Sequence, residues 1–269
     1  MGNSLINIPE KIELPDCINN AILKATDKPA QTIGTIVSDL FNLSFGWVSY
    51  LSEKQRIKYS HGLEKLKKSL EEKASAIPDE RRIEPDLQVA GQALENVKYC
   101  LDKEELREMF ANLIASSMDL SKYNKAIPLF SMIIKQLTPY DTKILSTFSG
   151  VYNNVNPICR YDAKNNSGSV ILQTNVYLEG ITEANVSEIE KRAASISSLC
   201  VLGLVETNYS DFLVNESLYD QFDKIEAYYD YARKAESLGG NRKINITKGH
   251  VALTPIGKQF VEICMPEQK

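Results

Sequence analysis

The residues best suited to bind a metal or to act as a nucleophile are few and widely spaced. The chain has two histidines, His61 and His250, and five cysteines. The cysteines are Cys17, Cys100, Cys159, Cys200 and Cys264. No two cysteines form a C-x-x-C pair, and no zinc-ligand spacing can be built from this set. We therefore expect no metal site, no cofactor, and reduced, buried thiols.

Sequence motifs for phosphate binding and for a nucleophilic serine are also absent. Gly239-Gly240 precedes basic residues, but no G-x-x-x-x-G-K pattern occurs. A G-x-S-x-G sequence does not occur either. Carboxylate pairs such as Glu104-Glu105 lie in helical stretches, where they are typical of solvated faces or caps. The sequence therefore predicts a protein that is not an enzyme.

The composition is that of an ordinary globular protein. The 269 residues are 43% hydrophobic and 25% charged, and the net charge is −4. This balance provides no general attraction to nucleic acid or to an anionic membrane. The first residues lack the basic start and apolar run of a secretory signal. Together with the scattered cysteines, this predicts a cytoplasmic location.

Residues 29–52 contain a single charged residue, Asp39, and are long enough to cross a bilayer. Their apolar residues recur at helical spacing, which predicts a helix. A central Asp is costly in hydrocarbon, so a buried or oligomer-facing helix is favoured over a membrane helix. The residues that would form the oligomer or membrane surface are Leu40, Phe41, Phe45 and Trp47.

A basic amphipathic helix is predicted directly afterwards. Residues 53–73 carry seven Lys or Arg and four Glu, and their leucines recur at helical spacing. Such a charged face is typical of a solvated helix, but peripheral membrane proteins also dock through an apolar helix next to a basic one. A membrane-perturbing effector that uses residues 29–73 is therefore one alternative function.

The first half of the chain is predicted to be helical. Residues 1–28 form a lead-in with a short helix at Cys17–Ala25, and residues 29–137 form a helical domain. Further helices are expected at Leu87–Cys100, from Asp102 onward, and at Leu129–Leu137. Asp102 and Glu105 have the spacing of a capping box.

Residues 138–269 follow the order of elements in a winged-helix domain. Thr138-Pro139 has the composition of a helix start, and a strand is expected at 169–178. The next helix has one apolar stripe and is predicted to end at Gly203, where a positive φ favours glycine. The stripe consists of Ile189, Ala193, Ile196, Leu199 and Cys200.

The end of this pattern is a predicted β-hairpin over Ile244–Leu253, with Lys248-Gly249 in its turn. Thr254-Pro255 then begins a last helix. A short strand is expected to start at Leu204-Val205. An insertion at about 208–243, which includes an acidic and aromatic helix, separates this strand from the hairpin. The expected fold class is mainly α with a small β component, ending in a winged-helix-like domain.

The charge of the winged-helix-like domain argues against specific DNA binding. Residues 137–269 hold 13 Lys and Arg against 16 Asp and Glu, whereas affinity for DNA depends on neutralising phosphates. Lys191 and Arg192 could still form a small basic patch, so a DNA-binding transcriptional regulator is the second alternative function. We predict weak and nonspecific nucleic-acid binding at most.

Three tyrosines of the insertion, Tyr228, Tyr229 and Tyr231, are candidates for an interaction surface, because exposed tyrosines are frequent at interfaces. The alternative is that they pack the inserted helix against the rest of the domain. Winged helices also serve as protein-interaction modules, so the fold does not decide the function.

The middle of the chain resembles a known family. The stretches that carry the resemblance are FNLSFGWVSYLSEKQRIKY, IPDERRIEPDLQVAGQALENVKYCLDKEELREMFANLIASSMD and AIPLFSMIIKQLTPYDTKIL. Over residues 30–150 the chain is similar to the abortive infection alpha proteins of bacteria and phages. The resemblance implies a role in conflict between the two, and it brings no catalytic residues. We expect phage defence or exclusion through contact with a phage or host protein, and a homo-oligomer.

Overall fold

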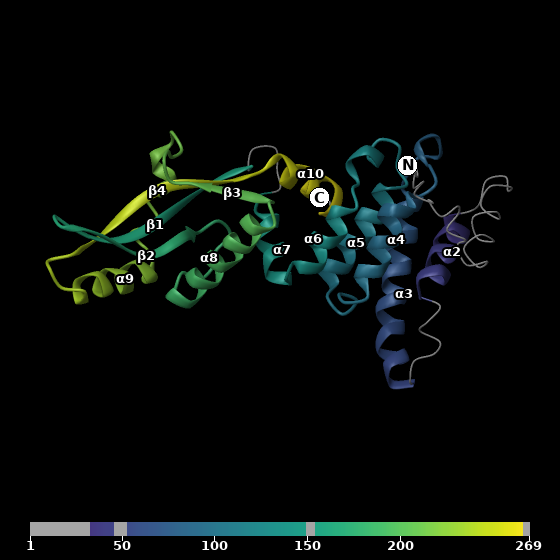
Figure 1. The fold of residues 1–269 in the computed structure, drawn as a ribbon, viewed down its shortest axis with the longest axis horizontal. Coiled ribbons are helices and arrows are strands. Elements are labelled where there is room, and N and C mark those ends of the chain that lie inside the picture. Colours follow the sequence, from purple (N-terminus) through teal and green to yellow (C-terminus); the bar gives the residue numbers. More distant parts are fainter. Residues whose placement is uncertain (1–32, 46–52, 149–153, 266–269) are drawn as a thin grey trace, which may run out of the picture.

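The computed structural model describes the chain apart from residues 1–32, 46–52, 149–153 and 266–269. The described residues form an elongated molecule, with a lobe of helices at one end and a lobe built on a β-sheet at the other (Figure 1). The short helix expected at Cys17–Ala25, and also Trp47, lie outside the described residues.

The helical lobe is organised around one buried helix. Its helices are α2 (Ile33–Phe45), α3 (Glu53–Ser75), α4 (Leu87–Val97), α5 (Glu104–Ser116) and α6 (Leu129–Gln136), with short 3₁₀ turns η2 (Asp79–Arg81) and η3 (Tyr123–Lys125). Helix α5 packs against α3, α4 and α6. Its apolar stripe, which includes Leu106, Phe110 and Leu113, is fully buried because neighbours cover it on several sides. For residues 33–45 and 53–137 the prediction of a helical first half is therefore confirmed.

Two details of the predicted helices are wrong. Helix α4 ends at Val97, because the chain turns back and buries the following Cys100 among the helices. Helix α5 begins at Glu104 with Lys103 at its N-cap, so the predicted capping box of Asp102 and Glu105 does not form.

The second lobe contains an antiparallel sheet with the strand order β2-β1-β4-β3. Its elements are α7 (Pro139–Ser146), β1 (Val155–Asn165), β2 (Gly168–Tyr177), α8 (Val186–Val201), β3 (Val205–Asn208), η4 (Glu216–Tyr219), α9 (Glu226–Ser237) and β4 (Lys243–Leu253). In Figure 1 helices α8 and α9 lie along the same side of the sheet. Tyr219 of η4 belongs to one hydrophobic cluster with Ile189 of α8 and Tyr231 of α9.

Three predicted helix boundaries in this lobe agree with the structure. Thr138 and Asp141 form a capping box at the start of α7. Gly203 follows α8 with a φ of 72°. Thr254 caps α10 (Pro255–Cys264) by accepting a hydrogen bond from Gly257 N. These boundaries depend on local capping chemistry, which a sequence carries in full.

The predicted hairpin over Ile244–Leu253 is wrong. These residues form one continuous strand, β4, which pairs with β1 along its length and with β3 at one end. Gly249 lies within this strand. Its position requires a glycine, because a Cβ there would lie 2.4 Å from the carbonyl oxygen of Asn208. The glycine serves a close approach of two backbones and not a turn.

The actual hairpin joins β1 and β2, whose end residues Asn165 and Gly168 are paired. Strand β1 was not predicted. The winged-helix arrangement is therefore not confirmed, and the fold is mainly helical with a four-stranded antiparallel sheet.

Helix α10 connects the two lobes. It leaves the sheet at Leu253 and packs against α5, where Asn112 Nδ2 donates to Cys264 O at 2.9 Å. The Phe260 ring meets the Phe130 ring of α6 edge-on, with centroids 5.2 Å apart. One continuous hydrophobic core therefore extends from the helical lobe into the base of the sheet.

Candidate interaction surface

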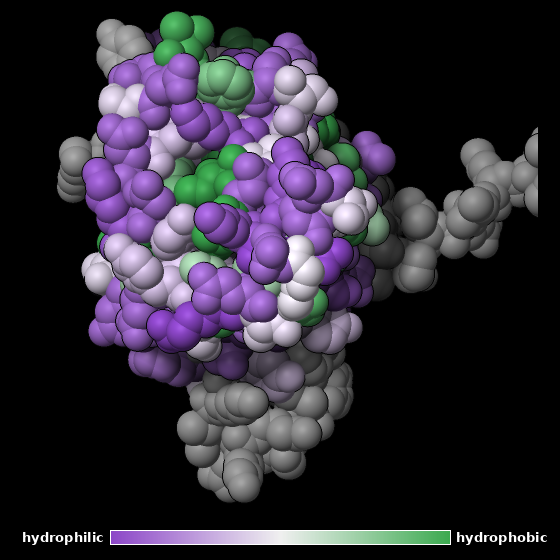
Figure 2. All heavy atoms as spheres, turned by 90° about the vertical axis from the view of Figure 1, so that its left-hand side faces the viewer, coloured by the Kyte–Doolittle hydropathy of each residue, from purple (hydrophilic) through white to green (hydrophobic). Residues whose placement is uncertain are grey.

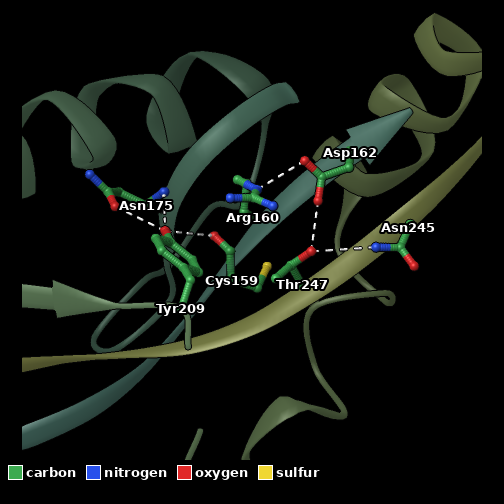
Figure 3. Close-up of polar contacts among 7 residues, drawn as sticks. All are labelled: Cys159, Arg160, Asp162, Asn175, Tyr209, Asn245 and Thr247. Atoms are coloured by element: carbon green, nitrogen blue, oxygen red, sulfur yellow. Dashed lines mark hydrogen bonds and ion pairs between the residues drawn. The ribbon is translucent and has the colours of Figure 1, made fainter. Parts of the chain in front are cut away.

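A small polar network joins the two central strands of the sheet (Figure 3). Asp162 on β1 is buried, and its carboxylate accepts from Arg160 Nε at 2.9 Å and from Thr247 Oγ1 at 2.7 Å. Asn245 Nδ2 donates to the same threonine hydroxyl at 3.4 Å. A buried carboxylate with these partners is satisfied, so the network fixes β1 against β4.

Tyr209, the residue directly after β3, is bound to the far strand of the sheet. Its hydroxyl accepts from the backbone N–H of Asn175 at 2.8 Å and donates to Asn175 Oδ1 at 2.9 Å (Figure 3). Burial raises the pKa of Tyr209 to about 12, so the phenol stays protonated at neutral pH. The chain that leaves β3 therefore starts from a fixed position.

The insertion that follows is anchored by buried aromatic residues. The hydroxyl of Tyr219 donates to Gly249 O at 2.7 Å and accepts from Leu213 N at 3.1 Å. Tyr161 of β1 donates to Phe222 O at 2.6 Å. Tyr219, Tyr161 and Phe222 belong to one hydrophobic cluster beneath the insertion. The segment between β3 and α9 is therefore held in place.

Other apolar residues of the same segment point to solvent. Val214 is 99% exposed, and Phe212 and Leu218 are also exposed. Lys248 lies over the Phe212 ring and forms an ion pair with Glu216 at 2.5 Å. Figure 2 shows hydrophobic residues among hydrophilic ones at the top of this end of the molecule, where Figure 1 places the η4 segment.

Acidic residues flank these three side chains in the sequence, and two of them are paired: Asp211 with His250 and Glu216 with Lys248. Residues 211–230 contain six Asp or Glu and one Lys. We call Phe212, Val214 and Leu218, together with the exposed carboxylates of Asp211, Glu216 and Asp220, the insertion surface. Its chemistry suits a partner that carries apolar and basic side chains.

The sequence reasoning missed this surface. Its signal is a group of apolar residues in an acidic stretch, DFLVNESL, that has neither helical nor strand periodicity. Apolar residues without a period have no defined face to bury, so some of them remain exposed.

The three candidate tyrosines have different environments. Tyr231 is buried, donates to Gln173 Oε1 at 3.0 Å and packs on Tyr161. Burial raises the pKa of Tyr231 to about 12. Tyr228 is half-buried against Tyr161, and Tyr229 is exposed on α9. Only Tyr229 among them presents most of its ring to a partner.

The candidate basic patch on α8 is reduced to one residue. Arg192 is 1% exposed, and its Nη1 donates to the backbone oxygens of Glu179 at 2.8 Å and Tyr177 at 3.3 Å. It is covered because it lies beside the buried stripe of α8 and faces the end of β2. Lys191 remains exposed, with its Nζ 3.9 Å from the centre of the Tyr140 ring.

The apolar helix α2 is covered within one copy of the chain. Leu40, Phe41 and Phe45 are buried and belong to the core shared with α3 and α4. In the described part of the chain no helix combines the length and the apolar content of a membrane span.

Of the four cysteines that the structure describes, Cys100, Cys159 and Cys264 are buried and Cys200 is half-buried, and all four are free thiols. Cys17 lies outside the described residues. Burial raises the pKa of the Cys100, Cys159 and Cys264 thiols, which makes each a poorer nucleophile. Among the described residues, no three His, Cys, Asp or Glu side chains gather in an arrangement that could hold a metal ion.

A family model described as "Abortive infection alpha" matches residues 58–264. The match leaves out residues 30–57 of the region that carried the resemblance, and it continues past residue 150 to include the whole sheet and α10. No curated protein matches the chain. No solved structure matches it either.

Proposed function

Because this chain belongs to the abortive infection alpha family, we propose that it acts in phage defence or exclusion by binding a phage or host protein through the insertion surface. The observation that carries the binding step is a fixed segment that exposes three apolar side chains and three carboxylates.

The anchoring of the insertion supports a binding role. Tyr219 and Phe222 hold the segment to the sheet before any partner arrives. A surface that is ordered in advance loses less conformational entropy on binding, and more of the contact energy remains as affinity. Covering Val214 and its apolar neighbours would contribute about 25 cal/mol for each Å² of apolar area removed from water.

The carboxylates of the surface define the class of partner. Asp211, Glu216 and Asp220 are exposed around the apolar side chains. An acidic rim speeds the approach of a basic partner and disfavours acidic ones. We therefore propose a protein partner with a basic patch around an apolar centre.

A non-enzymatic mechanism fits the chemistry of the described residues. The groups with clearly shifted pKa values are tyrosines, thiols and two carboxyls, those of Glu188 and Asp119. The Glu188 carboxylate accepts a hydrogen bond from Tyr140, and the Asp119 carboxylate forms an ion pair with Arg81. These arrangements hold helices and strands together. We propose that the protein acts by binding and not by catalysis.

The test is a plating assay with phage on cells that express the chain. We expect Val214→Lys combined with Leu218→Lys to abolish protection, because the change removes apolar contacts and repels a basic partner. The matched control is Val201→Lys at the exposed end of α8, which should protect like the wild type. Circular dichroism must show that both variants are folded.

A photo-crosslinking residue at position 214 should capture one phage or host protein during infection, whereas the same residue at position 201 should not. Full protection by the double lysine variant would contradict the proposed surface. Wild-type cells that plate every tested phage like empty cells would contradict the defence role itself.

A further inference from the structure

Strand β2 is an open edge of the sheet. It is the outermost strand in the order β2-β1-β4-β3. An edge strand presents unpaired N–H and C=O groups that can pair with another strand, and proteins usually block such edges with charge, proline, bulges or short length. The sequence of β2, GSVILQTNVY, has neither a charged residue nor a proline over ten residues.

The opposite edge of the sheet carries that protection. Strand β3 has only four residues and includes Glu206. Beyond β3, the edge of β4 carries Lys243 and Lys248, and its Gly249 carbonyl accepts the Tyr219 hydroxyl. The two edges therefore differ, and only β2 lacks charged residues.

One end of β2 is regular enough to pair. Gly168–Ile171 pair residue for residue with Asp162–Asn165 of β1, whereas the register shifts further along the strand. All four residues of this end are exposed, with Val170 at 42% and Ile171 at 57%. Exposed β-branched side chains on a regular edge form the type of strand that pairs most readily.

We propose that this end of β2 pairs antiparallel with β2 of a second copy, across a two-fold axis beside Val170 and Ile171. The two sheets would then join into one continuous sheet. A two-fold axis places each strand against itself, so a charged residue near the axis would face its own copy. The uncharged sequence of β2 removes this repulsion, and the β-branched side chains become cross-strand neighbours.

The pairing leaves the insertion surface free. Tyr219, which anchors that surface, binds to Gly249 of β4, and β1 separates β4 from β2. The dimer would therefore present two copies of the insertion surface, whether or not that surface has the partner proposed above.

The test is the sedimentation of the full chain as a function of concentration. We expect the wild type to form a dimer and Ile171→Lys to raise its dissociation constant by about tenfold or more, because the lysines would face each other across the axis. Ser169→Lys should act in the same way. Leu238→Lys, at the 46% exposed residue directly after α9, is the control and should stay dimeric.

Thermal melts of each variant must show a folded chain. Hydrogen exchange adds a second measurement. Alternate amides of residues 169–171 point away from β1, and these outward amides should become protected only at concentrations where the wild type is dimeric. A wild type that is monomeric at every concentration would overturn the proposal. A dimer that persists in both Ile171→Lys and Ser169→Lys would overturn it as well.

Discussion

A short polar chain across α7 and α8 shows how single residues hold this fold. The Tyr140 hydroxyl donates to Glu188 Oε1 at 2.6 Å, and Arg192 Nε lies 3.5 Å from the same oxygen. The hydrogen bond from Tyr140 is the main reason that the pKa of Glu188 is lowered. Burial, together with the neighbouring Glu188, raises the pKa of Tyr140 to about 12.

This pair predicts a dependence of stability on pH. A lowered carboxyl pKa contributes stability above the unfolded pKa of about 4.3, and the contribution is lost as pH falls through the folded pKa. Tyr140→Phe removes the hydrogen bond to an ionised group, which is worth about 1.5–3 kcal/mol at neutral pH. We expect the free energy of unfolding of the wild type to exceed that of the variant at pH 7. This difference should shrink as the pH falls below the unfolded pKa of the carboxyl.

The same pair acts in the opposite direction at high pH. A raised tyrosine pKa keeps its contribution below the unfolded pKa of about 10 and loses it as pH rises towards 12. Urea unfolding across the pH range measures both the loss of stability at low pH and the loss at high pH. Tyr229→Phe, at an exposed residue, is the control. Parallel pH profiles for the wild type and Tyr140→Phe would show that the hydrogen bond does not contribute.

At the scale of elements, the contact of α10 with the start of β3 depends on a glycine. A Cβ at Gly257 would lie 1.9 Å from the carbonyl oxygen of Leu204. Thr254, which caps α10, also donates to Gly203 O at 2.6 Å. The first turn of α10 is therefore packed directly on the backbone between α8 and β3.

Two glycine substitutions separate packing from backbone strain. Gly257→Ala must push α10 away from Leu204, and we expect a loss of about 3 kcal/mol or more. Gly203→Ala meets open space among the described residues, but it must adopt a φ of 72°, for a cost of about 1–2 kcal/mol. Urea unfolding gives both values. A larger loss of stability for Gly203→Ala than for Gly257→Ala would show that α10 does not pack against Leu204.

At the scale of the whole molecule, the two lobes share one core through α10. Phe260 is fully buried, and its ring packs on Phe130 of the helical lobe. The same core includes Val251 and Leu253 of the sheet. A core that is continuous between lobes favours cooperative unfolding.

Phe260→Ala therefore tests whether the lobes depend on each other. We expect a loss of about 3–5 kcal/mol, as is usual for removing a buried ring. Hydrogen exchange should show faster opening of α5 and of β4 by the same factor, because both lose the same contact. A variant in which only the sheet opens faster would show that the lobes unfold separately.

Local chemistry in the sequence determined the starts of α7 and α10 and the end of α8. The Thr-Pro starts of α7 and α10, the buried stripe of α8 and the glycine after it all follow from interactions within a few residues. For the same reason strand β2 was predictable from its apolar, β-branched residues.

Contacts between distant segments decided the rest. Glycine at position 249 suits a turn as well as a close approach. Pairing with Ile158 of β1 makes it part of a strand, and the neighbouring Asn208 backbone leaves no room for a Cβ. Arg192 looks like a surface cation in the sequence, and the backbone oxygens of Tyr177 and Glu179 bury it. Within the insertion Tyr219 and Phe222 are buried against the sheet, whereas Val214 is exposed. Which apolar residues of this segment are buried is a property of the packed molecule, and no local pattern encodes it.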